Sequence, residues 1–118
     1  MHRTTILVAD DHSIVKEGLV SLLKEHDFDL VGAVTDGVAL VEEARRLRPD
    51  VIISDISMPR LSGLEALERI MAEHLPCKII MLTSSINPQD FNRSKKYVNV
   101  KLYLNKPLTH ESIMGLSL

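Results

Sequence analysis

The residues with the clearest chemical potential are carboxylates that come directly after short apolar runs. Asp10 and Asp11 follow the run ILVA, and Asp55 follows VIIS. A buried strand does not usually carry a carboxylate to its end unless a cation, a hydrogen bond or a reaction uses it. Two other groups lie at the ends of such runs: the hydroxyl of Thr83 directly follows one, and the ammonium group of Lys106 follows another after Asn105. These five side chains are the candidate site.

The chemistry that suits this set is the binding and transfer of a phosphoryl group. Carboxylates held close together repel one another, so at neutral pH they need a cation or bound protons. Oxygen ligands of this kind suit Mg²⁺, which takes one or two carboxylates, keeps several waters and bridges to phosphate. Lys106 and Thr83 would help to balance a dianionic phosphoryl group, and Asp55 would be the nucleophile that forms an acyl phosphate. A simpler interpretation is that Asp10 and Asp11 cap a helix beginning near Ser13.

The elements that must position these groups alternate along the chain. Four apolar runs predict strands covered on both faces, and a fifth run, which alternates, predicts an edge strand. Three amphipathic stripes predict helices between the strands, and Ser62 with Glu65 forms a capping box before the third of them. Asn87 and Pro88 begin a fourth predicted helix, and a short fifth helix starts at Thr109. The five predicted strands are residues 6–9, 30–34, 51–53, 79–82 and 100–104.

This order, a strand followed by a helix five times, predicts one α/β domain over residues 1–118. Right-handed crossovers place the strands in a parallel sheet with helices on both faces. The doubly wound, flavodoxin-like fold with strand order 2-1-3-4-5 suits a chain of this size. Ligands of such sheets bind outside the carboxyl ends of the strands. The carboxylates, Thr83 and Lys106 should therefore meet at one edge.

Composition excludes several other classes of protein. No apolar run approaches the ~18 residues of a membrane span, and no cleavable signal pattern opens the chain. The single cysteine, Cys77, excludes an internal disulfide framework and indicates a reducing cytoplasm. A net charge of −2 argues against nucleic acid as the main partner of this segment. The five histidines, His12 among them, show no metal-ligand spacing and are predicted to be surface or helix-end residues.

The candidate site residues together resemble a known signature. It is that of the receiver domains of bacterial response regulators in two-component signalling, and the resemblance runs from about residue 6 to residue 108. It implies Mg²⁺-dependent transfer of a phosphoryl group from a sensor histidine kinase, or a phosphotransfer protein, to Asp55. The residues that carry the resemblance are Asp10-Asp11, Asp55 with Met58-Pro59, Thr83 and Lys106-Pro107.

The resemblance also implies a role for individual residues. Asp11 and Asp55 would bind Mg²⁺ directly, Asp10 would hold a metal-bound water, and the main-chain carbonyl of Ser57 would complete the protein ligands. In the same way, Thr83 would be the switch hydroxyl, Lys106 the cation that pairs with the phosphoryl group, and Tyr103 the switch aromatic. Ser57 and Ser85 would tune the decay of the acyl phosphate.

The function expected from this resemblance is that of a cytoplasmic signalling switch, not of an enzyme with turnover. The surface around the predicted fourth helix and fifth strand would form a homodimer interface or bind a downstream output partner. An aspartate-nucleophile phosphatase is an alternative, but it would need a second Asp where Ser57 stands. A flavin or nucleotide carrier would need a phosphate-cradling loop and more than 3% aromatic residues. An interaction module that works without phosphate is a further alternative, but it would usually lack one of the pocket residues, and none is missing here.

A change of composition near residues 82–84 suggests a further hypothesis. Residues 1–82 contain no Asn or Gln, whereas residues 83–118 contain five. The first segment resembles receivers that precede a helix-turn-helix output domain, and SSINPQDFNRSKKY resembles stand-alone receivers of another lineage. The chain is therefore either a chimera, natural or engineered, that lacks an evolved output, or one receiver with an ordinary drift of composition. A piece of a longer protein is also compatible with the sequence.

Overall fold

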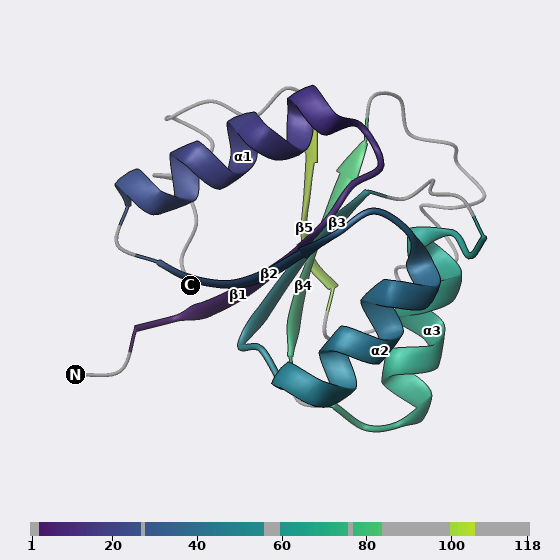
Figure 1. The fold of residues 1–118 in the computed structure, drawn as a ribbon. Coiled ribbons are helices and arrows are strands. Elements are labelled where there is room, and N and C mark those ends of the chain that lie inside the picture. Colours follow the sequence, from purple (N-terminus) through teal and green to yellow (C-terminus); the bar gives the residue numbers. More distant parts are fainter. Residues whose placement is uncertain (1–2, 27, 56–59, 76, 84–99, 106–118) are drawn as a thin grey trace.

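Five parallel strands form one sheet in the order β2-β1-β3-β4-β5, which confirms the predicted order (Figure 1). The computed structural model describes residues 3–26, 28–55, 60–75, 77–83 and 100–105, and of residues 14, 15, 64, 83 and 100–105 it describes the backbone only. The strands are β1 (Thr5–Ala9), β2 (Asp29–Val34), β3 (Val51–Asp55), β4 (Lys78–Thr83) and β5 (Val100–Asn105).

The pairing register brings the carboxyl ends of the central strands to the same edge. Ala9 of β1 pairs with Ser54 of β3, so Asp10 and Asp55 are the next residues on two neighbouring strands. On the other side of β3, Asp55 pairs with Leu82, and Thr83 follows. This edge is where the sequence predicted the site.

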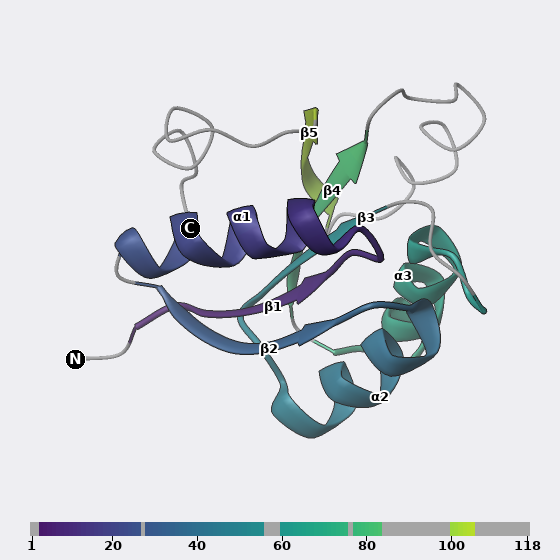
Figure 2. The same cartoon turned by 45° about the horizontal axis from the view of Figure 1, so that its top comes forward.

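Helices cover both faces of the sheet because side chains along a buried strand point alternately to its two sides. On β1, Ile6 and Val8 pack with α1 (Ser13–Glu25), whereas Leu7 and Ala9 pack with α2 (Gly37–Leu47) and α3 (Gly63–Ala72). Figure 2 shows α1 on one side of the sheet and α2 with α3 on the other. The continuous apolar run is therefore explained by two cores, one on each face.

The predicted helical stripes are confirmed where side chains are described. Buried residues of the stripes are Leu19 and Leu23 in α1, Leu40, Val41 and Ala44 in α2, and Leu67 and Ile70 in α3. Ser62 caps α3, since its hydroxyl accepts a hydrogen bond from the Glu65 amide at 3.1 Å. The predicted fourth and fifth helices lie outside the described residues. Within the described ranges, no helix combines the length and apolarity needed to cross a membrane.

Strand β2 corrects one expectation. Its apolar run predicted a strand covered on both faces, but its side chains are partly exposed and Ala33 is exposed. The reason is its place in the sheet, because β2 is an edge strand with a neighbour on one side only. The alternating run 100–104 was predicted to be an edge strand, and β5 does lie at the opposite edge.

Candidate functional site

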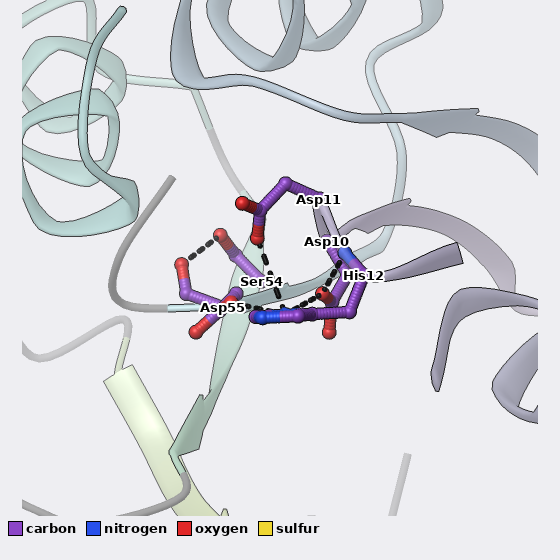
Figure 3. Close-up of polar contacts among 5 residues, drawn as sticks. All are labelled: Asp10, Asp11, His12, Ser54 and Asp55. Carbon is purple, nitrogen blue, oxygen red and sulfur yellow. Dashed lines mark hydrogen bonds and ion pairs between the residues drawn. The ribbon is translucent and has the colours of Figure 1, made fainter. Parts of the chain in front are cut away.

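Four residues gather at the carboxyl edge of β1 and β3. One side-chain ligand atom from each of Asp10, Asp11, His12 and Asp55 lies within 4.8 Å of all the others (Figure 3). Asp10 to His12 belong to the segment between β1 and α1, and Asp55 ends β3. The sequence therefore correctly predicted that the three carboxylates meet.

Burial divides this acidic cluster into an inner and an outer part. Asp10 is fully buried and Asp55 is nearly so, whereas the side chain of Asp11 is 33% exposed and that of His12 is 62% exposed. A ligand from solvent would therefore meet Asp11 and His12 first. The carboxylate of Asp55 lies deeper, at the end of a strand that is buried throughout.

Asp10 is held in place by the backbone around it. Its amide donates a hydrogen bond to the carbonyl of Val34 at 3.1 Å, and its Oδ1 accepts one from the His12 amide at 2.8 Å. The N-cap residue of α1 is His12, and its side chain makes no capping hydrogen bond. The interpretation of Asp10 and Asp11 as caps of this helix is therefore not supported, since the Asp10 contact lies before the first helical residue.

The imidazole of His12 lies among the three carboxylates (Figure 3). Its Nδ1 is 3.1 Å from Oδ1 of Asp10, 3.3 Å from Oδ1 of Asp11 and 3.6 Å from Oδ2 of Asp55. The prediction of an exposed, helix-end residue is confirmed, but the sequence reasoning did not place this ring in the site. The available signal was its position directly after the acidic pair.

The backbone of Asp55 is fixed from two sides. The buried hydroxyl of Ser54 donates a hydrogen bond to the Asp55 carbonyl at 2.9 Å. A Cβ added to Gly63 would lie only 1.7 Å from the same carbonyl oxygen. The first turn of α3 therefore packs directly on the end of β3, which is possible because residue 63 has no side chain. Sequence reasoning did not identify either contact.

An ion pair connects the segment after β3 to the start of α2. Asp36 is the N-cap of α2, where its Oδ1 accepts a hydrogen bond from the Ala39 amide at 2.8 Å. The guanidinium of Arg60 lies 3.1 Å from the same oxygen. The Ala39 amide, together with Arg60, holds the pKa of Asp36 below its ordinary value of 3.8.

The other predicted site residues are only partly covered by the structure. Thr83 ends β4, and the backbone of Tyr103 in β5 pairs with Met81 of β4. Both residues therefore lie on neighbouring strands, as predicted, near the edge that carries Asp55. Ser57, Ser85 and Lys106 lie outside the described residues.

The donor set of the acidic cluster fits a divalent cation. Three carboxylates from two adjacent strand ends offer several oxygens within one small volume. Oxygen ligands suit Mg²⁺, which needs only one or two carboxylates and keeps water on its remaining positions. Asp11 is accessible to a hydrated ion, and Asp55 lies beside it, so the arrangement can hold a cation next to a potential nucleophile.

Comparison with known proteins gives a consistent result. A family model described as the response regulator receiver domain matches residues 6–116. The transcriptional regulatory protein DesR of Bacillus subtilis is 39% identical over 110 residues, which are 92% of this chain and 54% of that protein. The transcriptional regulatory protein YdfI of the same species is 40% identical over 80 residues, which are 67% of this chain and 37% of that protein.

Solved structures agree with the sequence relatives. A crystal structure of a DNA-binding response regulator of the LuxR family from Staphylococcus aureus superposes with a TM-score of 0.84 at 31% identity, covering 93% of this chain and 92% of that one. The chain spans about half, or less, of the length of the two curated relatives. From its fold, its matched residues and these relatives, the chain belongs to the receiver domain family of two-component response regulators.

Proposed function

We propose that Asp55 is the phosphoacceptor of this receiver domain. One observation carries the proposal: a nearly buried carboxylate ends β3, and the carboxylates of Asp10 and Asp11 lie within 4.8 Å of it. Asp55 and Asp11 would hold Mg²⁺ directly, with the Ser57 carbonyl, and Asp10 through a water. When bound, Mg²⁺ would neutralise the carboxylates and the phosphoryl oxygens during transfer.

The proposed step is a phosphoryl transfer between a phosphohistidine and Asp55. One carboxylate oxygen of Asp55 attacks the phosphorus, a P–O bond forms and the P–N bond breaks. The electron pair of the broken bond returns to the donor imidazole, which then takes up a proton. The hydrogen bond from Ser54 to the Asp55 carbonyl holds the attacking residue in position.

The remaining roles are proposed from the family signature. Lys106 would pair with the phosphoryl group and Thr83 would bind it as the switch hydroxyl, while Tyr103 would respond as the switch aromatic. Ser57 and Ser85, both short, would leave the acyl phosphate only lightly shielded from water. The backbone positions of Thr83 and Tyr103 on neighbouring strands support the coupling between these two residues.

The partners and the setting follow from the same proposal. The donor of the phosphoryl group would be a sensor histidine kinase or a phosphotransfer protein. The phosphorylated chain would then form a homodimer or bind a downstream partner. The two Bacillus subtilis relatives are transcriptional regulatory proteins, and the chain matches only part of each. We propose that this segment is not an enzyme with turnover and that it does not bind nucleic acid directly. A single cysteine supports a cytoplasmic location.

Mass spectrometry tests the proposal. We expect acetyl phosphate with Mg²⁺ to add one phosphoryl group to the wild-type protein, and Asp55→Asn to abolish the addition because an amide is a poor nucleophile. Asp36→Asn is the matched control, since Asp36 lies at the start of α2 and contacts Arg60 rather than the acidic cluster. An unmodified wild type, or a modified Asp55→Asn protein, contradicts the assignment.

A further inference from the structure

His12 places a nitrogen donor inside a cluster that otherwise offers only oxygen. Its Nδ1 is 3.1, 3.3 and 3.6 Å from carboxylate oxygens of Asp10, Asp11 and Asp55, respectively. The nitrogen therefore faces all three carboxylates at once, although the ring is more than half exposed. Nδ1 of His12 therefore lies near three carboxylates and not near a single hydrogen-bond acceptor.

These separations match the spacing of ligand atoms around one small cation. Bonds of ~2.1 Å place neighbouring ligands ~3.0 Å apart in an octahedron and ~3.4 Å apart in a tetrahedron. The distances from Nδ1 to Asp11 and Asp55, at 3.3 and 3.6 Å, lie near the tetrahedral value. An ion placed between Asp11 and Asp55 would thus have the imidazole nitrogen within reach after small movements.

From this geometry we infer that His12 determines which divalent ions the pocket accepts, and that it provides a direct nitrogen ligand to Zn²⁺. Imidazole suits Zn²⁺, whereas carboxylate and water suit Mg²⁺. Two carboxylates and one imidazole leave a fourth position open to water or phosphate, as zinc sites with three protein ligands do. The inference rests on the proposed function in so far as it concerns the same pocket, where Zn²⁺ would compete with Mg²⁺.

The hydrogen-bonding geometry of the ring is compatible with this role. Nδ1 lies 3.1 Å from Oδ1 of Asp10, a hydrogen bond that requires the ring proton on Nδ1. A cation bound by Nδ1 would take the place of that proton, and the ring N–H would then be on Nε2. The His12 amide is held independently by Oδ1 of Asp10 at 2.8 Å, which fixes the backbone from which the ring projects. Ion binding would therefore not require movement of α1.

Calorimetric titration of the wild type and of His12→Gln with Zn²⁺ and with Mg²⁺ tests the inference. We expect His12→Gln to weaken Zn²⁺ binding by at least ~10-fold, since even outer-shell partners of a metal contribute ~10- to 100-fold. The loss for Mg²⁺ should be much smaller. His26→Gln, at the other end of α1, is the matched control and should leave the Zn²⁺ affinity of the pocket unchanged.

Nitrogen NMR of ¹⁵N-histidine-labelled wild-type protein gives a second readout. Zn²⁺ should shift the Nδ1 resonance of His12 and hold the proton on Nε2, whereas Mg²⁺ should not. Equal losses for both ions in His12→Gln, no loss for either, or an unshifted Nδ1 resonance would overturn the inference. Phosphorylation of the wild type with Mg²⁺ is measured separately. A protein that binds Zn²⁺ through His12 but is never phosphorylated supports this inference and refutes the proposed function.

Discussion

At the level of single residues, the site combines a buried carboxylate, the proposed nucleophile, with a more accessible one, the proposed metal ligand. Asp55 is almost entirely buried, and Asp11, a neighbour in the same cluster, is one third exposed. Carboxylates held close together repel one another, so the three together favour a bound cation. His12 adds a nitrogen to this set, and under our inference this one side chain would determine the ion preference.

Substitution of Asp11 tests its role as a direct Mg²⁺ ligand. We expect Mg²⁺ to bind with a dissociation constant in the micromolar to millimolar range, roughly as sites with few protein ligands do. Asp11→Ala should weaken this binding by at least ~10-fold, because it removes a ligand and a negative charge. His12→Ala should weaken it far less. Titration followed by calorimetry distinguishes the two variants, and equal losses would contradict the assignment of Asp11.

At the level of the elements, the start of α3 packs closely against the end of β3, where Asp55 lies. A Cβ on Gly63 would collide with the Asp55 carbonyl oxygen at 1.7 Å, and one on Gly37 would lie 1.9 Å from the carbonyl oxygen of Leu61. Both are backbone atoms, which cannot move aside as the end of a flexible side chain can. The starts of α2 and α3 therefore depend on glycine.

Two alanine substitutions test this dependence. Gly63→Ala should lower the free energy of unfolding by ~1–3 kcal/mol, the usual cost of overpacking, and should move Asp55. Gly18→Ala is the matched control, because nothing lies within 4 Å of a Cβ in the middle of α1. It should raise stability by ~1 kcal/mol through helix propensity. Urea unfolding measures both changes, and a neutral Gly63→Ala would show that the helix start adapts.

The cap of α2 should make stability depend on pH. The pKa of Asp36 is held below 3.8 in the folded protein, first by the Ala39 amide. Its contribution is therefore complete above the unfolded pKa, and is lost as the pH falls through the lower folded value. Asp36→Asn keeps a good N-cap but cannot ionise. The stability difference between wild type and variant should thus shrink in acid, and a difference independent of pH would contradict this.

For the whole molecule, the sheet connects the site to the surface that would carry a signal. Thr83 ends β4 and pairs with Asn105 of β5, and Tyr103 pairs with Met81. A change at the proposed phosphoryl-binding edge would therefore pass directly from β4 to its neighbour β5. Such a switch requires two states of the same surface, whose populations the ligand shifts.

Beryllofluoride, which mimics a phosphoryl group on a carboxylate, tests this coupling. With Mg²⁺, it should change the amide NMR shifts between Phe91 and Tyr103 in addition to those beside Asp55. Asp55→Asn is the control and should show neither set of changes. If the pocket is occupied and the distant shifts do not change, the coupling has been lost. That outcome is the one expected of a chimera joined near residues 82–84.

Much of the fold could be predicted because local patterns carry its information. Continuous apolar runs indicated strands buried on both faces, and Leu7 and Ile6 indeed contribute to different cores. The same reasoning failed for β2, because an apolar run does not show how many neighbours a strand has. Its exposure is decided by its edge position in the assembled sheet.

The sequence alone determined that Asp10, Asp11 and Asp55 belong to one site, because residues that follow parallel strands must gather at one edge. Only the tertiary structure placed the His12 ring among these carboxylates and Gly63 against the Asp55 carbonyl. Both contacts depend on the direction in which one segment leaves a strand and on how closely a helix approaches another backbone. Those distances are set by the packing of all layers together, and the order of residues in one segment does not contain them.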